Sequence, residues 1–262
     1  MSRFKLTIEY EGTRYRGWQV QKNARTIQGE IEHALRQHVG AQPFEFQGGG
    51  RTDAGVHAVG QVAHLDVNTP VTPEELRDRL NESLPPDINI LSLVAVHPRF
   101  HARHHAQSRT YLYQISRRRS ALAKRFVWWI REPLNVKAMR EAASHFVGMK
   151  DFRSFARDNP GEKSTLMFLS EFALHETGDL ILIRVTGSHF LWNSVRRMVG
   201  TLAEVGRDRL SGDDLKRIIA TGTEPTGHLT APPSGLFLEH IQYDGGTPLH
   251  PLRPVFPIHS TS

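Results

Sequence analysis

The sequence predicts an α+β protein made of two similar halves, each an antiparallel sheet with helices packed on one face. Three observations lead to this fold class. Short segments in which apolar residues alternate at a period of two predict strands, and several of these segments are neighbours along the chain. Segments of helical period begin at residues that favour helix caps and end at glycine or proline. A length of 262 residues suits two modest domains better than one.

The first half contains three predicted strands and two predicted helices. Apolar and polar residues alternate from Phe4 to Tyr10, as in a strand with one buried face. Thr26 is a helix cap, and Gly40 stops that helix. Thr72 caps the second helix, with proline at its first position and a glutamate that completes a capping box. The predicted strands are 4–10, 61–67 and 88–96, and the predicted helices are 27–39 and 73–84.

The second half repeats this alternation, and the two halves are candidates for distant structural duplicates. A strand begins at Arg109 and places Arg109, Tyr111 and Tyr113 on one face. A hairpin turned at Gly178 is predicted within 171–185. Helices are predicted after the caps Asn135, Ser188 and Ser211, the first of them running to Gly148, and a last strand at 236–243.

This order of elements predicts three regions. We expect an amino-terminal domain over residues 1–105 and a carboxy-terminal domain over residues 106–244. Residues 245–262 form a Pro-rich tail, with prolines at positions 248, 251, 254 and 257, and we expect it to be poorly ordered.

The composition excludes several classes of protein. A hydrophobic share of 39% and a charged share of 23% are those of a globular protein. No stretch approaches the ~20 consecutive apolar residues of a spanning helix, and the start of the chain leaves no room for a secretory signal. The absence of cysteine excludes disulfides and thiolate metal sites. We therefore expect a cytoplasmic protein with no membrane partner.

The charge of the chain indicates a polyanionic partner. The net charge is +6, and residues 88–131 contain nine Arg or Lys residues and no Asp or Glu. Such a run is commonly a solvated face, but without balancing acids it repels itself unless an anion lies nearby. Lys and Arg gain free energy when they displace counterions from phosphate, so nucleic-acid contact is the favoured interpretation.

The most unusual segment is a glycine-rich loop around Asp53. Gly48-Gly49-Gly50 precedes Arg51, Thr52 and Asp53, with Ala54-Gly55-Val56-His57 following. Glycines allow positive φ and a close approach of the backbone to a ligand. The loop has neither the Gly-Lys-Ser/Thr of a phosphate-binding loop nor the pattern of a dinucleotide site. Asp53 can cap a turn, and it can also serve as an active carboxylate if a cation offsets its desolvation.

The segments of this sequence resemble the tRNA pseudouridine synthase A family in the family's own order, over roughly residues 3 to 243. The similar motifs are Tyr10-Glu11-Gly12-Thr13, Gly17-Trp18-Gln19-Val20-Gln21, Gly50-Arg51-Thr52-Asp53-Ala54-Gly55-Val56-His57-Ala58, Phe100-His101-Ala102-Arg103, Arg109-Thr110-Tyr111-Leu112-Tyr113, Phe190-Leu191-Trp192-Asn193-Ser194-Val195-Arg196 and Ala231-Pro232-Pro233-Ser234-Gly235-Leu236. Trp192 and Ser194 replace the tyrosine and methionine usual in the family, but Arg196 is in place.

The resemblance implies an isomerase that converts uridine to pseudouridine at positions 38 to 40 of the tRNA anticodon stem-loop. It implies Asp53 as the catalytic carboxylate, Arg196 as its partner, and Tyr111 as the residue that stacks on the uracil and takes part in proton transfer. Arg51 and Arg109 are candidate contacts to the RNA backbone or bases, and ordinary structural ion pairs are the competing explanation for them. The reaction involves no net redox change and no hydrolysis, so we expect no cofactor and no metal. The implied partners are tRNA and a second subunit of a homodimer, with the active-site cleft between the two halves of each chain.

Two other classes remain to be distinguished. A non-catalytic RNA-binding protein would explain the charge but would leave Asp53 without a purpose. A metal-dependent nuclease would need several converging carboxylates or histidines. The histidines at 101, 104 and 105 lack a glutamate motif, and we expect them to add to an RNA-facing surface.

Overall fold

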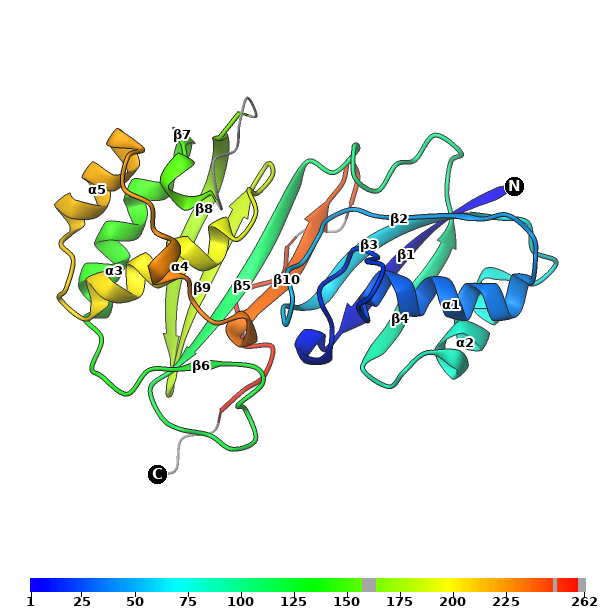
Figure 1. Cartoon of the computed structure of the whole chain (residues 1–262), viewed down its shortest axis with the longest axis horizontal. Helices are drawn as coiled ribbons and strands as arrows, with labels where there is room; N and C mark the ends of the chain where they lie inside the picture. The colour runs from blue at the N-terminus through cyan, green and yellow to red at the C-terminus, as the bar shows by residue number, and fades with distance from the viewer. Residues whose placement is uncertain (157–163, 247–248, 259–262) are drawn as a thin grey trace. The chain divides into compact units, whose positions relative to one another are not determined.

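The computed structural model describes residues 1–156, 164–246 and 249–258, and the chain divides into two compact units (Figure 1). Unit 1 comprises Met1–Gln107 and Phe237–Leu249, and unit 2 comprises Ser108–Leu236 and His250–Ser262. The first crossing lies two residues beyond the boundary that the sequence predicts. The chain then returns to unit 1 for most of its last strand, which the sequence prediction had kept in the second half.

Unit 1 is built on a mixed sheet in which β3 is central. The strands are β1 (Ser2–Tyr10), β2 (Glu45–Gly48), β3 (His57–Val67), β4 (Ile88–Ala95) and β10 (Leu236–Gln242). They pair in the order β4-β1-β3-β10, with β2 also paired to β3. Alternate residues of β1, from Phe4 to Tyr10, are buried, which confirms the predicted strand with one buried face.

The two helices of unit 1, α1 (Ile27–Val39) and α2 (Pro73–Ser83), begin at the predicted caps. The Thr26 hydroxyl accepts the N–H of Gly29 at 3.2 Å, and the Thr72 hydroxyl accepts the N–H of Glu75 at 3.2 Å. Gly40 ends α1 with a positive φ of 62°. These local hydrogen bonds satisfy helix donors that would otherwise lack a partner, so they determine where each helix starts.

The sheet strands of unit 2 follow the order β5-β9-β8-β7. Its strands are β5 (Ser108–Ser116), β6 (Trp128–Trp129), β7 (Gly148–Asp151), β8 (Leu166–Thr177) and β9 (Leu180–Gly187). The predicted hairpin is confirmed, because β8 and β9 are antiparallel and meet at Gly178, where φ is 55°.

The prediction of purely antiparallel sheets is wrong. Strand β10 runs parallel to β3, and β6 runs parallel to β5, while the remaining described pairs are antiparallel. Strands that are neighbours in sequence form antiparallel hairpins easily, but β3 and β10 are separated by most of the chain. The protein therefore has an α+β fold with a large mixed sheet.

Three helices group against the sheet of unit 2 (Figure 1): α3 (Val136–Ala143), α4 (Ser194–Gly206) and α5 (Gly212–Thr221). Asn135 and Ser211 are their predicted caps, and α3 gives way to a 3₁₀ turn well before Gly148. The predicted start of α4 at Ser188 is wrong, because α4 begins after Asn193, whose φ of 62° is left-handed. None of the helices in the described parts of the chain is long and apolar enough to cross a membrane.

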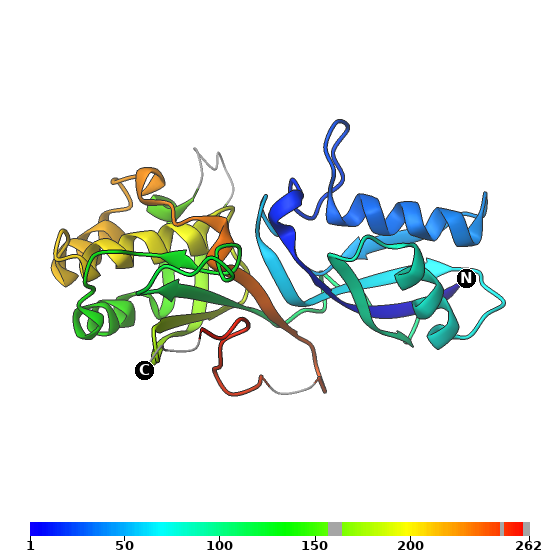
Figure 2. The same cartoon turned by 90° about the horizontal axis from the view of Figure 1, so that it is seen from below.

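The described part of the tail, residues 249–258, packs on unit 2, although the sequence predicts poor order there. Figure 2 shows this segment, in red, and α4 on opposite sides of β5. The tail side chains Leu252, Val255, Phe256 and Ile258 pack against Leu112, Ala123, Val127, Leu180 and Leu182. The buried Gln114 amide oxygen also accepts the N–H of Val255 at 2.7 Å. The apolar side chains between the prolines can be buried against unit 2, and this burial orders the tail. The number of prolines alone does not reveal this.

Candidate active site

Asp53 lies in the loop between β2 and β3, next to an anchored threonine. Thr52 is 6% exposed, Asp53 is partly buried, and Arg51 is exposed. The Thr52 hydroxyl lies 2.7 Å from the hydroxyl of Tyr10, the last residue of β1. Gln61 on β3 donates to the same Tyr10 oxygen at 3.5 Å. Burial raises the pKa of Tyr10, so its phenol stays neutral and holds this contact.

Backbone hydrogen bonds fix the loop on both sides of Asp53. The N–H of Trp18 donates to the Thr52 carbonyl at 3.1 Å, and the N–H of Gly55 donates to the Tyr15 carbonyl at 3.3 Å. The Asp53 carbonyl accepts the N–H of Val56 at 3.1 Å, which closes a tight turn. The carboxylate therefore projects from a backbone with little freedom to move.

Two glycines outside the loop allow its close packing. A Cβ at Gly12 would lie 1.9 Å from the Val56 carbonyl oxygen, and a Cβ at Gly17 would lie 2.6 Å from the Thr52 carbonyl oxygen. Gly17 also has a φ of 96°, which L residues rarely adopt. The segment from Gly12 to Trp18 thus belongs to the same structural unit as Asp53, which explains why the two motifs occur together.

The glycine triplet has a different role from the expected one. None of Gly48, Gly49 and Gly50 has a positive φ. A Cβ at Gly48 would lie 2.6 Å from the Trp18 ring, and one at Gly49 would lie 2.8 Å from the Tyr243 hydroxyl oxygen. A Cβ at Gly50 meets nothing closer than 3.8 Å. At Gly49 a Cβ would lie equally close, at 2.8 Å, to the backbone oxygen of Ala102, so the close approach at the first two positions is to the protein itself.

His57 is a supporting residue that the sequence analysis did not single out. Its buried ring accepts the N–H of Gly12 at Nδ1, at 3.0 Å, and stacks on Phe237 with ring centroids 4.9 Å apart. Since Nδ1 accepts, it carries no proton in this arrangement. The sequence offered one indication of this role, namely the position of His57 at the end of the glycine-rich motif. From there its imidazole joins three segments, the loop itself, the turn at Gly12 and the strand at Phe237.

The two tyrosines of β5 have different surroundings. Tyr113 is fully buried, its hydroxyl donates to the Pro232 carbonyl at 2.7 Å, and burial raises its pKa. Tyr111 is 8% exposed and meets the ring of Phe190 edge to face at 5.1 Å. Tyr113 is thus a core residue, and Tyr111 remains the candidate for the site.

Arg196 lies in the first turn of α4, and its side chain is held in place. Its Nε donates to the Ala231 carbonyl at 2.7 Å, and one Nη donates to the Asn193 side chain at 3.3 Å. Gly200, one turn further on, lets α4 approach the following loop, because a Cβ there would lie 1.5 Å from the Leu229 carbonyl oxygen. The guanidinium is therefore oriented by the end of one helix and one loop.

Arg197, the next residue of α4, is buried in unit 2. It is 8% exposed, and one Nη donates to the carbonyl of Ala156.

The predicted site residues fall into two groups. Asp53 and Arg51 share one loop of unit 1, whereas Arg109, Tyr111 and Arg196 belong to unit 2. Arg109 is the second residue of β5, and it donates to the carbonyl of Ser188, in the segment that leads to α4, at 2.9 Å. The pairing of Asp53 with Arg196 would join the two units, and it stays a prediction.

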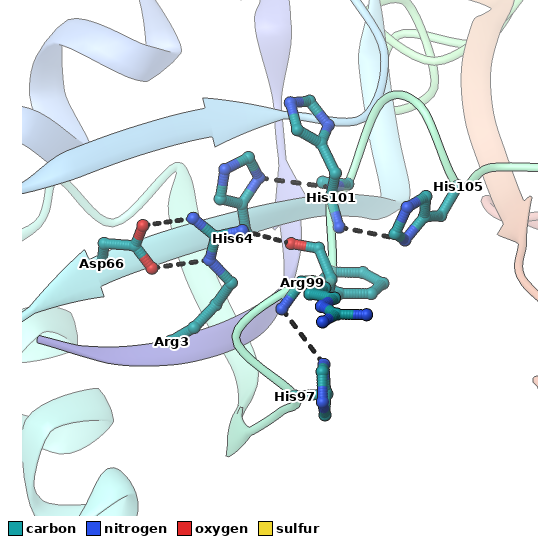
Figure 3. A network of polar contacts seen from close by, with 9 residues as sticks. Arg3, His64, Asp66, His97, Arg99, His101 and His105 are labelled. Atoms are coloured by element: carbon teal, nitrogen blue, oxygen red, sulfur yellow. Dashed lines mark hydrogen bonds and ion pairs between the residues drawn. The ribbon is translucent and has the colours of Figure 1, made fainter.

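Figure 3 shows the histidines that follow β4, together with Arg3 and Asp66. The Nδ1 atom of His101 accepts the N–H groups of Arg103 and His104, each at 3.2 Å, and His105 accepts the N–H of His101 at 3.2 Å. These rings therefore cap backbone donors of their own loop. In the parts of the chain that the structure describes, no three His, Asp or Glu side chains are arranged to hold a metal ion. An RNA-facing role for the histidines stays a prediction.

Comparison with known proteins defines the class. A family model described as tRNA pseudouridine synthase matches residues 6–105 and 142–244. The tRNA pseudouridine synthase A of Bartonella tribocorum is 42% identical over 248 residues, and that of Geobacter sulfurreducens is 40% identical over 246 residues. The tRNA pseudouridine synthase A 2 of Bacillus cereus is 37% identical over 246 residues. Each alignment covers 93% of this chain and 100% of the relative. The chain therefore belongs to the tRNA pseudouridine synthase A family.

Proposed function

We propose that this chain isomerises uridine to pseudouridine in the anticodon stem-loop of tRNA, at positions 38 to 40, with Asp53 as the catalytic carboxylate. The observation that carries the proposal is the immobilised loop of Asp53, held by Thr52, Tyr10 and the backbone of residues 12–18. The matching family is described as tRNA pseudouridine synthase, and its reaction needs such a carboxylate, whereas simple RNA binding does not.

The reaction requires a group that can act on the ribose or on the base. The bond between uracil N1 and ribose C1′ breaks, C1′ joins C5, the C5 proton leaves, and N1 gains a proton, so no oxidant and no water are consumed. A carboxylate can attack carbon covalently or remove a proton while it is ionised at neutral pH. Asp53 meets this requirement by either route.

Two residues of unit 2 complete the proposed site, in a cleft between two similar halves of the chain. The Arg196 guanidinium holds Asp53 ionised and oriented, because an arginine fork matches a carboxylate. Tyr111 stacks on the uracil and takes up the C5 proton. Replacement by phenylalanine keeps the ring and removes the hydroxyl, so a fully active Tyr111→Phe variant would reject the proton-transfer role.

The target uridine must leave its stack to reach Asp53, at a cost of about a few kcal/mol that is smallest in loops. Arg51, which is exposed, and Arg109, which is partly buried, are suited to hold the flanking phosphates. We propose that the protein acts in the cytoplasm, and the absence of cysteine is compatible with that compartment.

We also propose that the active form is a homodimer that cradles one tRNA across both subunits. Met149 on β7 and Phe168 on β8 are cross-strand partners, and both are exposed, as is Leu166 beside them. Such an apolar strip on an edge of a sheet is a surface that a second copy would cover. A Phe168→Glu variant that remains dimeric by analytical ultracentrifugation would exclude this face.

The experiment that tests the proposed activity is tritium release from tRNA labelled at uridine C5, in the presence of a chelator. We expect release by the wild type and none by Asp53→Ala. A non-catalytic RNA-binding protein would bind tRNA without release, and a metal-dependent nuclease would be inactive in the chelator. Mapping pseudouridine in tRNA from cells without this protein identifies the positions, and intact modification at 38 to 40 would reject the assigned target.

A further inference from the structure

Residues 117–131, which lead from β5 through β6, form a basic loop that the proposed chemistry does not use. This basic loop carries six cations and no acid, and it lies outside both stretches that the family model matches. The cations are Arg117, Arg118, Arg119, Lys124, Arg125 and Arg131.

Two of these cations are neutralised by the neighbouring hairpin. Arg117 forms an ion pair with Glu176, and Arg118 forms one with Asp179 at 3.0 Å, both at the turn between β8 and β9. Arg119, Lys124 and Arg131 are exposed, and no ion pair involves them within the described residues. Arg131 is next to Glu132, and its positive charge helps to lower the pKa of that carboxyl group. The least compensated charge therefore lies at Arg119 and Lys124.

The basic loop is held firmly against the sheet, which distinguishes it from a solvated charge run. Ala123, Val127 and Ile130 are buried, and the ring of Phe126 stacks on Phe256 of the tail with centroids 4.9 Å apart. A ligand that binds between these anchors orders little additional backbone, so less conformational entropy is lost on binding.

An aromatic side chain accompanies the charges. The Arg119 guanidinium lies 5.8 Å from the centroid of the Trp129 ring, and Trp129 is 41% exposed. Arginine with an exposed aromatic ring is a common combination on surfaces that bind RNA.

The position along β5 separates the start of this loop from the reacting uridine. Arg117 lies six positions after Tyr111 along the extended chain, which corresponds to about 20 Å at ~3.3 Å per residue. This separation applies to the start of the loop, from Arg117 to Arg119, which a duplex stem of the same RNA can reach. The middle of the loop lies closer to Tyr111, because Phe126 accepts a hydrogen bond from Gln114 at 3.0 Å and the ring of Trp128 lies 6.2 Å from that of Tyr113.

We propose that the basic loop is a second RNA-binding surface, in which Arg119, Lys124 and Arg131 bind the phosphate backbone of a duplex part of the tRNA away from the uridine that reacts. This inference rests on the proposed function for the identity of the RNA. Duplex RNA is recognised mainly through its shape, phosphates and 2′-hydroxyls, and cations on a fixed scaffold suit such recognition.

The test is the salt dependence of binding to a full-length tRNA transcript. Each phosphate contact contributes about 0.9 to the slope of log K against log salt, so removing three lowers the slope by about 2.7. Between 50 and 200 mM salt, the wild type should therefore lose about 40-fold more affinity than a variant with Arg119→Gln, Lys124→Gln and Arg131→Gln. The turnover rate at saturating tRNA should not change.

The matched pair Lys124→Gln and Arg117→Gln controls for overall charge, because each removes one cation from the same loop. We expect Lys124→Gln to lower the slope by about 0.9 and Arg117→Gln to leave it unchanged, since Glu176 already compensates Arg117. An unchanged slope in the triple variant, or equal effects in the matched pair, would overturn the inference. A fall in saturated turnover would overturn it as well, by placing the loop at the reaction site. If the wild type released no tritium, the proposed function would fail while these binding results still decided the role of the loop.

Discussion

Replacing Gly12 by alanine should damage catalysis without touching any residue that contacts the substrate. A Cβ at this position would lie 1.9 Å from the Val56 carbonyl oxygen, in the turn that carries Asp53. Real Cβ atoms do not come closer than 3.0 Å to such an atom, so the two segments must separate by at least 1.1 Å, the difference of the two distances. The same movement strains the hydrogen bond between the Gly12 N–H and His57, now 3.0 Å.

The expected size of the effect follows from this displacement. A misplacement of about 1 Å in a catalytic constellation can cost about 100-fold in rate, or about 3 kcal/mol of barrier. Overpacking costs about 1–3 kcal/mol of folding stability in addition, which a protein of ordinary stability survives. We therefore expect Gly12→Ala to fold, to bind tRNA with nearly unchanged affinity, and to react about 100-fold more slowly.

The assay is tritium release in a single turnover with saturating enzyme, with the dissociation constant for tRNA and the urea midpoint measured in parallel. Gly50→Ala is the matched control, because it lies in the same loop, has no positive φ, and its Cβ would meet nothing closer than 3.8 Å. The control should react at close to the wild-type rate. A folded Gly12→Ala variant within about threefold of wild type would refute the claim that this packing positions Asp53.

Three further changes have defined outcomes. Arg196→Ala should abolish turnover far more than it weakens tRNA binding, and wild-type turnover would reject its pairing with the carboxylate. Phe256→Ala removes the stacking on Phe126 and part of the buried surface of the tail, so urea unfolding should show a loss of about 2 kcal/mol, and no change would mean that the tail adds no stability. Burial lowers the pKa of His64 from its usual 6.5, and the positive charge of nearby Arg3 lowers it further. The unfolded chain therefore binds a proton at this histidine more readily than the folded chain does, so the folding stability falls as the pH drops below about 6.5. His64→Gln should flatten this loss between pH 7.5 and 5.5, and an equally steep profile would contradict the assignment.

Elements governed by local chemistry could be predicted from the sequence. Thr26, Thr72 and Ser211 each cap the helix that follows, because donor and acceptor lie three residues apart. The same reasoning failed at Ser188, whose N–H donates to the carbonyl of Phe168 and thereby continues a contact with β8. Four further residues follow before Asn193 turns the chain into α4. A distant partner, invisible to a local pattern, decided that boundary.

Pairings between distant segments were equally out of reach. Nothing in the residues of β10 shows that Phe237 lies opposite His57 in a parallel pair, since parallel neighbours are joined by long connections. The tail is a similar case, because Leu252 and Phe256 gain order only from the surface that they cover.

The motifs in the sequence predict the candidate site residues, but they do not predict the residues that support them. Asp53, Tyr111 and Arg196 stood out by resemblance, while Tyr10 was assigned only to an apolar strand face. Its hydroxyl contact with Thr52 depends on where β1 ends relative to the loop, which is a property of the folded sheet.

The central claim is that the carboxylate of Asp53 performs the chemistry and does not serve RNA binding. Asp53→Asn tests it most directly, because the amide keeps the size of the side chain and removes its charge. In a single turnover on C5-labelled tRNA, we predict no detectable tritium release and a dissociation constant within about threefold of wild type. Release within about tenfold of the wild-type rate, from a variant that is folded and binds tRNA normally, would contradict the account.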